Sequence, residues 1–437
     1  MLFLTLPAKN LAFLKEKIKK YENDVDGFEI RWDFAKDIPA KTVRKLTKLP
    51  LIFTLRSAKQ GGLTHSVTWE DMLLLAEASP DYMDLEYDWP KNWFEELKES
   101  FPNIKLIASY HHMEHVPENY PEMPLVDIQK IACFCSSSLD ALRLLNFSKT
   151  LKKDFILIGM GERGAFTRVM NLALGSLITF ASLPEEPVAP GQISIDDMNT
   201  IYRVRGINNH TQFYALLGNP VSHSIGHLFH NDYFEKHQMN ARYVKIEVAI
   251  DELAKFLEQA LLLPFQGMSI TMPLKLKAFD LCSSEDSSKS INTLVKNNQK
   301  WLGYNTDISG LWQILKSYSF KKVLILGAGG AGFALYEDFK QKGIEVVLFN
   351  RSPKAGKEIL SFEKPFPKVD LIINTLPTIE DSLKVKLEQY LCSEMLAIDF
   401  VYAQHEFSDL VKACGIKLIT GLDVFYQQAN LQQEIWQ

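Results

Sequence analysis

A lysine inside an apolar segment is the most informative single residue in the first half of the chain. Lys130 lies within the run DIQKIACFC, which is otherwise typical of a buried strand. Such a lysine either points outward at a strand edge, or is buried, where its pKa falls and its amine becomes an imine-forming nucleophile. Convergence of other charged groups on one site would favour the second interpretation. The polar residues that interrupt the neighbouring apolar runs are Glu29, Arg31, Arg56, Glu86, His111 and His112.

A second set of residues is typical of a nucleotide-binding loop. GAGGAG, residues 327–332, follows the apolar run VLIL and precedes a helical pattern, the context in which this motif is informative. Backbone N–H groups and the helix dipole at such a turn would hold a pyrophosphate, although a glycine-rich turn without a ligand is the alternative. The next run ends in FNRS rather than in an acidic residue, and Arg351 suits a 2′-phosphate, so we expect NADP(H) rather than NAD. The expected cofactor contacts are Gly327, Gly329, Gly330, Ala331, Asn350, Arg351 and Ser352.

The elements that would position Lys130 are eight short apolar runs alternating with helical patterns. Several runs are almost continuously apolar, as strands covered on both faces should be. Eight such units predict a (β/α)₈ barrel over residues 1–205, with active-site side chains at the carboxyl ends of its strands. The fifth unit is the weakest, because the proline-rich segment HMEHVPENYPEMP follows it. The runs begin at Leu2, Gly27, Pro50, Tyr82, Lys105, Asp127, Asp154 and Ser176.

A short polar stretch, residues 206–211, is the expected linker to a second α/β region. Strand-like runs continue in that region at KKVLIL, IEVVLFNR, VDLIINTLP, MLAIDFVY and IKLITG. Their alternation with helical patterns predicts a parallel, doubly wound sheet of the Rossmann kind.

The composition of the 437 residues bounds the class of protein. A net charge of -5 and a pI near 6.1 argue against nucleic-acid or membrane-surface partners, while local arginines could still hold a small anionic substrate. The five cysteines include no C-x-x-C pair, so neither a disulfide framework nor a metal site is expected. We find no bilayer-length apolar stretch and no signal-like start, and we expect a cytoplasmic protein.

Seven motifs of the first half occur in the order and spacing of type I 3-dehydroquinate dehydratases. They are GFEIRWD, IFTLRSAKQGG, YMDLEY, IASYHH, DIQKIA, MGERGAFTRV and APGQ. Residues 1–205 therefore resemble that family, which implies a barrel that dehydrates 3-dehydroquinate through a Schiff base.

The resemblance implies a role for each matching residue. Lys130 would form the Schiff base, and the protonated imine would acidify the adjacent C–H. His111 would remove that proton and return one to the departing hydroxyl, while Glu86 would orient His111 and fix its tautomer. Arg168 would clamp the substrate carboxylate. The groups expected around the substrate hydroxyls are Glu29, Arg31, Arg56 and Gln192.

The second half carries GNPVSHS, SITMPLK, INTLV, GYNTD and the terminal GLDVFYQQANLQQEIW. In this order the motifs resemble the shikimate dehydrogenase family over residues 212–437. The resemblance implies a substrate-binding domain over 212–315, closed by 422–437, and a Rossmann NADP-binding domain over 316–421. Lys275 and Asp307 would be the acid/base pair at the carbonyl that receives hydride. The expected contacts to 3-dehydroshikimate are Ser224, Thr271, Asn292 and Gln428.

Both resemblances together predict a bifunctional enzyme of the shikimate pathway that acts on small molecules. One departure keeps alternatives open for the second half. The family commonly reads S-x-S-P where this chain has Ser224, Ile225, Gly226 and His227, so one substrate-binding hydroxyl is missing. The second half could instead act on quinate, or be a degenerate NADP-binding regulatory module. The sequence leaves the oligomeric state open.

Overall fold

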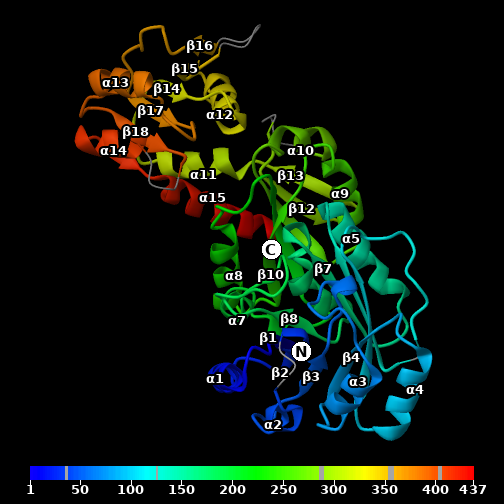
Figure 1. The fold of residues 1–437 in the computed structure, drawn as a ribbon. Helices are drawn as coiled ribbons and strands as arrows, with labels where there is room; N and C mark the ends of the chain where they lie inside the picture. The colour runs from blue at the N-terminus through cyan, green and yellow to red at the C-terminus, as the bar shows by residue number, and fades with distance from the viewer. Residues whose placement is uncertain (35–37, 125, 285–289, 353–358, 402–405) are drawn as a thin grey trace. The chain divides into compact units, whose positions relative to one another are not determined.

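The computed structural model describes residues 1–34, 38–124, 126–284, 290–352, 359–401 and 406–437. The chain divides into two compact units. The first comprises Met1–Ala215, Asn231–Val248 and Lys255–Phe265, and the second comprises the remaining segments up to Gln437. Figure 1 labels the helices and strands along the chain.

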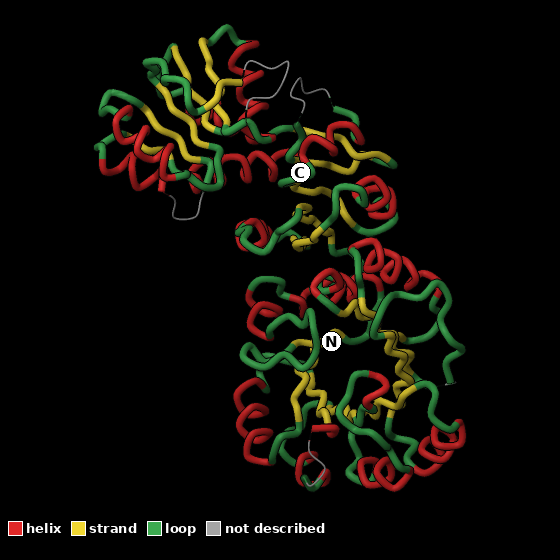
Figure 2. Tube along the Cα trace, turned by 45° about the horizontal axis from the view of Figure 1, so that its top comes forward, coloured by secondary structure: helices red, strands yellow, loops and turns green. Residues whose placement is uncertain are grey.

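All eight expected strands of the first half form one parallel sheet, in the order β7-β6-β5-β4-β3-β2-β1-β8. Because each strand except β7 and β8 has two neighbours, the sheet is a nearly closed barrel, and Figure 2 shows its strands inside a ring of helices. The strands are β1 (Leu2–Pro7), β2 (Gly27–Arg31), β3 (Leu51–Thr54), β4 (Tyr82–Glu86), β5 (Lys105–His112), β6 (Ile128–Phe134), β7 (Phe155–Met160) and β8 (Thr179–Ala181).

The helices of this part are short, and two of them begin at capping boxes in which side chains satisfy otherwise free N–H groups. Thr68 with Asp71 begins α3, and Ser137 with Asp140 begins α5. No helix lies among the described residues between β5 and β6, as the proline-rich fifth unit predicted. The helices are α1 (Leu11–Tyr21), α2 (Ala40–Arg44), α3 (Trp69–Ala76), α4 (Lys91–Ser100), α5 (Ser138–Phe147), α6 (Thr167–Met170) and α7 (Ile195–Thr200).

A five-stranded sheet follows in the order β10-β9-β11-β12-β13. β12 pairs antiparallel with both β11 and β13, and this hairpin was not predicted from the sequence. The strands are β9 (Gln212–Gly218), β10 (Ala241–Glu247), β11 (Phe265–Ile270), β12 (Thr293–Asn297) and β13 (Lys300–Tyr304). The helices are α8 (Gly226–Lys236), α9 (Leu253–Ala260), α10 (Lys275–Leu281) and α11 (Thr306–Leu315).

A six-stranded parallel sheet completes the chain, in the order β16-β15-β14-β17-β18-β19, as the doubly wound pattern predicted. Alternate residues of its strands enter two separate apolar cores, one under α11, α12 and α15 and the other under α13 and α14. The strands are β14 (Lys322–Leu326), β15 (Glu345–Asn350), β16 (Ile359–Ser361), β17 (Leu371–Asn374), β18 (Leu396–Asp399) and β19 (Lys417–Ile419). The helices are α12 (Gly330–Gln341), α13 (Asp381–Tyr390), α14 (Glu406–Ala413) and α15 (Gly421–Trp436). Among the described residues, no helix combines the length and apolarity that a membrane span requires.

Candidate active sites

Lys130 is buried inside the barrel and does not point outward at a strand edge. Only 4% of it is exposed. Its Nζ lies 2.8 Å from Asp84 Oδ2 and 3.5 Å from Glu29 Oε1. The ammonium group also lies 4.6 Å from the centre of the Phe180 ring. The barrel therefore encloses an amine between two carboxylates and an aromatic face.

Asp84, which the sequence reasoning missed, is the centre of this network. Its Oδ1 accepts hydrogen bonds from Arg56 at 2.7 Å and from Ser109 at 2.6 Å. Burial raises the pKa of Asp84, but the charges of Arg56 and Lys130 outweigh burial and hold that pKa well below its usual range. Asp84 therefore stays ionised at neutral pH. Its alternation with Glu86 in YMDLEY could have indicated that both side chains share a strand face.

Glu29 is held by hydroxyl groups from both neighbouring strands. Thr5 of β1 and Thr54 of β3 donate to its two oxygens at 2.8 and 2.9 Å. Both threonines are buried, and Thr5 lies beside Glu29 in the parallel register. Hydroxyl groups of both neighbouring strands thus fix the Glu29 carboxylate, which projects from β2 and lies 3.5 Å from Lys130 Nζ.

His111 is positioned by Gln60 rather than by Glu86. Gln60 Oε1 lies 3.1 Å from His111 Nδ1 and accepts the His111 backbone N–H at 3.2 Å, while its amide nitrogen donates to Asp88. These partners fix the Gln60 amide with its carbonyl toward the ring, so Nδ1 carries the hydrogen and Nε2 is left as a base. Burial and the charges of Arg56 and Lys130 lower the pKa of His111 well below its ordinary value, so the imidazole is neutral at pH 7.

The expected contact between Glu86 and His111 is corrected by the structure. Both carboxylate oxygens of Glu86 accept hydrogen bonds from Ser57, one from its backbone N–H and one from its hydroxyl, each at 2.7 Å. Arg56 lies 3.7 Å away. Glu86 therefore anchors the turn after β3, and η2 (Ala58–Gln60) at the end of that turn carries the partner of His111.

The other substrate-binding residues expected in the barrel, Arg31, Arg168 and Gln192, each have hydrogen-bond partners within the protein. Arg31 forms a bidentate pair with Asp33, with both distances 2.8 Å. Arg168 is buried, its Nε donates to the Gly191 carbonyl at 3.0 Å, and burial lowers its pKa to about 10 against the charge of Glu29. Gln192 accepts the backbone N–H groups of residues 188 and 189 and so shapes the loop after β8.

For the dehydration that the sequence resemblance implies, we expect Gln60→Ala to lower kcat about tenfold, because one hydrogen bond that fixes the imidazole tautomer is lost. Glu86→Gln should leave the His111 ring in place, since Glu86 does not contact it. Steady-state kinetics with 3-dehydroquinate compare the two variants. If kcat fell in Glu86→Gln and stayed unchanged in Gln60→Ala, Glu86 and not Gln60 would be the residue that orients His111.

The depressed pKa of His111 predicts the pH dependence of the barrel. A base acts only when neutral, so we expect the acid limb of kcat/KM to lie below pH 6.5, the ordinary imidazole value. The free energy of unfolding should likewise fall as the pH drops below 6.5, because the unfolded chain binds the proton more readily. Gln60→Glu should move the acid limb upward by adding a carboxylate beside the ring. An acid limb above pH 7 in the unaltered chain would contradict a neutral, desolvated His111.

The second half brings Lys275 and Asp307 together as the sequence predicted. Lys275 Nζ lies 2.6 Å from Asp307 Oδ2, with side-chain exposures of 16% and 14%. Lys275 begins α10, and Asp307 lies in the first turn of α11, where a negative charge is favoured. The pair is accessible enough to meet a ligand and close enough to exchange a proton.

Asn292 and Gln428 also meet. The Asn292 amide donates to Thr306 Oγ1 at 2.9 Å and to Gln428 Oε1 at 3.3 Å, and its oxygen accepts the Thr306 backbone N–H. Gln432 was not among the expected site residues. It lies one turn after Gln428 on α15, and its Oε1 accepts a hydrogen bond from Ser269 Oγ at 2.9 Å. Polar residues of α15 thus continue the network that starts at Asn292.

Ser224 and Thr271 lie in loops that follow two adjacent strands, β9 and β11. The Ser224 hydroxyl accepts the backbone N–H of Gly226 at 3.2 Å. The Thr271 backbone N–H donates to the Leu217 carbonyl at 2.9 Å and so joins the two strand ends. Described contacts therefore anchor both residues at the same edge of the sheet.

The glycine motif forms the turn between β14 and α12. Gly327 has a φ of +100°, which favours glycine. A Cβ at Gly332 would lie 1.9 Å from the Gly327 carbonyl oxygen, so helix and turn approach too closely for any side chain. A Cβ at Gly329 would meet nothing within 4 Å. The loop thus has open space beside the amino end of α12, which is where a pyrophosphate would fit.

The end of β15 supplies the other half of the nucleotide site. Asn350 Oδ1 accepts the Ala328 backbone N–H at 3.3 Å and links this strand end to the glycine turn. Arg351 pairs with Glu380 at 2.6 Å, and both line a cavity of about 290 Å³ together with Asn350 and Ser352. A cationic group therefore faces a cavity beside the strand end, as a 2′-phosphate site requires.

A barrel with a buried lysine and a glycine-loop sheet with a lysine–aspartate pair define a chain of two enzyme halves. Comparisons with known proteins agree with this class. Residues 2–209 match the family model of type I 3-dehydroquinase, and residues 216–294 match that of the shikimate dehydrogenase substrate binding domain. The chain belongs to the family of bifunctional shikimate-biosynthesis proteins that join these two enzymes.

Two relatives show the family along nearly the whole chain. The shikimate biosynthesis protein AroDE of Chlamydia pneumoniae is 31% identical over 461 residues, covering 100% of this chain and 95% of that protein. The chloroplastic bifunctional 3-dehydroquinate dehydratase/shikimate dehydrogenase of Arabidopsis thaliana is 31% identical and covers 96% and 79%. Among solved structures, shikimate dehydrogenase from Aquifex aeolicus is similar with a TM-score of 0.49 and 29% identity, covering 53% of this chain and 94% of that one.

Proposed function

We propose that the barrel dehydrates 3-dehydroquinate and that the second half reduces the resulting 3-dehydroshikimate to shikimate with NADPH. The observation that carries the proposal is the buried amine of Lys130 between Asp84 and Glu29. The charge of this amine helps to keep His111 neutral. The family and the names of the relatives support both reactions. Turnover of 3-dehydroquinate and of shikimate by the purified chain tests them.

In the barrel, each group has a task that its environment allows. Lys130 first releases its ammonium proton to water, and the free amine attacks the ketone. Loss of water from the resulting carbinolamine gives a protonated imine that draws electrons from the adjacent C–H bond. His111 Nε2 takes the proton from that carbon and returns a proton to the departing β-hydroxyl, which leaves as water. Asp84 stays ionised and orients the nitrogen of Lys130. Hydrolysis of the imine then frees the amine and releases the product.

The remaining barrel groups bind and orient the substrate in this proposal. Arg168 is the buried cation for the substrate carboxylate, because its position leaves N–H groups beyond the one that holds Gly191. The hydroxyl contacts are assigned to Glu29, Arg31, Arg56 and Gln192.

In the second half, Lys275 and Asp307 manage the proton while NADPH supplies the hydride. Ketone reduction creates an alkoxide, and a lysine paired at 2.6 Å with a carboxylate can deliver a proton to it. Asn292 and Gln428, which share a hydrogen bond, and Ser224 and Thr271 would hold the substrate hydroxyls and carboxylate. Gly327, Gly329, Gly330 and Ala331 would present backbone to the pyrophosphate.

In this proposal Arg351 determines the preference for NADP over NAD. Because Arg351 forms an ion pair with Glu380, replacing either residue should change NADP affinity, in opposite directions. Arg351→Gln should weaken NADP binding about tenfold with little change for NAD, because only NADP carries the 2′-phosphate. Glu380→Gln should tighten NADP binding a few-fold by freeing the guanidinium. Fluorescence titration of both variants with both nucleotides gives the dissociation constants. Equal losses for NAD and NADP in Arg351→Gln would place the 2′-phosphate elsewhere.

The altered Gly226 and His227 keep quinate as a second candidate substrate for this half. Rates with shikimate and quinate, each with NADP and NAD, separate the two candidates. Binding of NADP without oxidation of either compound would instead favour a regulatory module.

We further propose the domain division 1–205, 206–211, 212–315 with 422–437, and 316–421. The family matches that end at residue 209 and begin at residue 216 support its central boundary. A cytoplasmic location is proposed from the cysteines, all five of which are free thiols.

A further inference from the structure

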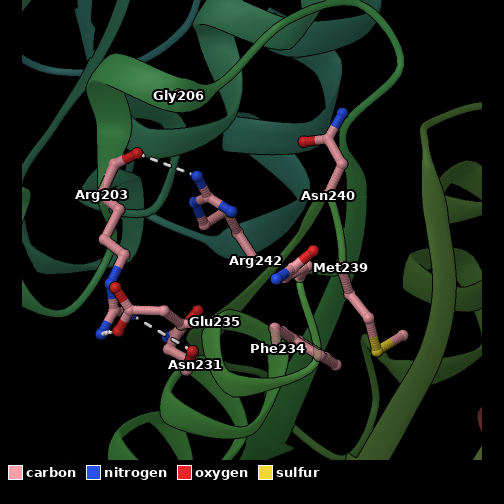
Figure 3. Close-up of a pocket in the computed structure, with 9 residues that line it drawn as sticks. Arg203, Gly206, Asn231, Phe234, Glu235, Met239, Asn240 and Arg242 are labelled. Carbon is pink, nitrogen blue, oxygen red and sulfur yellow. Dashed lines mark hydrogen bonds and ion pairs between the residues drawn. The ribbon is translucent and has the colours of Figure 1, made fainter.

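A cavity of about 340 Å³ is lined by none of the residues assigned to the two candidate active sites. Its walls come from residues 203–206, which follow α7, and from residues 231–242, which run from α8 into β10 (Figure 3). All of them belong to the first compact unit. None of them has a task in either proposed reaction.

Arg242 is a buried cation in the wall of this cavity. Only 9% of it is exposed. It donates to the Ala241 carbonyl at 2.7 Å and to the Arg203 carbonyl at 2.9 Å, the contact drawn in Figure 3. Its Nε–H has no hydrogen-bond partner, and among the described residues no carboxylate forms an ion pair with it. Burial and the nearby charge of Arg203 lower the pKa of Arg242 to about 10.

The second arginine of the cavity is already neutralised. Arg203 forms an ion pair with Glu235, and its guanidinium also donates to the carbonyls of Ile201 and Asn231 at 3.2 Å each. Glu235 also lines the cavity and its charge acts on Arg242 as well, but one carboxylate faces two guanidinium groups, so the wall keeps one net positive charge. A buried charge is normally paired or ligated, because burial without compensation costs several kcal/mol.

We propose that this cavity binds a small oxyanion, carried by a carboxylate or a phosphate group, through the guanidinium of Arg242. The guanidinium has five N–H groups, of which two serve backbone carbonyls, so donors remain for an anion. Gln238 lies on the exposed rim and lines the same cavity, where its amide adds a neutral donor. The site is separate from the nucleotide cavity at Arg351 and from the barrel arginines.

Calorimetric titration of the full chain with inorganic phosphate, and separately with acetate, tests the site at constant ionic strength. Gln238→Glu places a negative charge on the rim and should weaken anion binding about tenfold. Gln299→Glu makes the same charge change on an exposed turn outside the cavity and should have no such effect. Active-site arginines are the same in all three proteins, so their own anion binding cancels in the comparison.

Arg242→Gln should remove the cavity's phosphate and acetate binding altogether. If that variant fails to fold, because two backbone carbonyls lose their donor, Gln238→Glu still decides. Tighter binding of phosphate than of acetate identifies a phosphate ligand, and the reverse order identifies a carboxylate. Equal affinities in the unaltered chain and in Gln238→Glu, for both anions, would overturn the proposal.

Discussion

Replacement of Lys130 by alanine is expected to lower the dehydratase kcat by at least about four orders of magnitude, because no other group can form the imine. Lys130→Arg distinguishes loss of the imine-forming amine from loss of the positive charge. It keeps a cation beside Asp84 and Glu29 but cannot form a Schiff base with a ketone, so it should be equally inactive. The same chain should keep its dehydrogenase activity, which shows that it has folded.

Trapping locates the imine directly. Borohydride added with 3-dehydroquinate should reduce the imine and add ligand mass to the peptide that contains Lys130. Lys98, an exposed lysine paired with Asp127, is the matched control and should remain unlabelled. Labelling of another lysine, or undiminished activity in Lys130→Ala, would refute the assignment.

Replacement of Lys275 by methionine should lower the dehydrogenase kcat about 10²- to 10⁴-fold, the range for loss of a positioned proton donor. NADP affinity should remain within about threefold, since the expected nucleotide contacts lie elsewhere. Lys277→Met, two residues later on α10, changes the same charge without touching Asp307 and should be nearly silent. Kinetics with shikimate and titration with NADP give both numbers.

Asp307→Asn keeps the size and shape of the side chain but removes the negative charge beside Lys275, and it should also lower kcat. A large loss of NADP binding in Lys275→Met, with kcat preserved at saturating NADP, would show that Lys275 holds the nucleotide instead. The two variants together therefore distinguish proton transfer from cofactor binding.

The barrel was predictable from the sequence because its strands are covered on both faces and therefore form nearly continuous apolar runs. Polar interruptions within those runs also identified Lys130, His111 and Glu29. The partner of His111 was not predictable in this way. Gln60 lies in a short turn 51 residues before His111, and only the folding of η2 against β5 brings the two together.

The choice between Asp84 and Glu86 shows a related limit. Both side chains project from β4, but Glu86 lies two residues further along the strand than Asp84. The register of β4, β5 and β6 decides which of the two reaches Lys130. In the second half, the motifs predicted the Lys275–Asp307 pair. The β12–β13 hairpin and the contact of Gln432 with Ser269 depend on tertiary packing that periodicity does not encode.

The most direct test of two activities in one chain is to add 3-dehydroquinate and NADPH to the purified protein and follow NADPH absorbance. We expect oxidation of one equivalent of NADPH for each 3-dehydroquinate, abolished by either Lys130→Ala or Lys275→Met. In Lys275→Met, 3-dehydroshikimate should accumulate instead. Accumulation of 3-dehydroshikimate by the unaltered chain, with no NADPH consumed, would contradict the second activity.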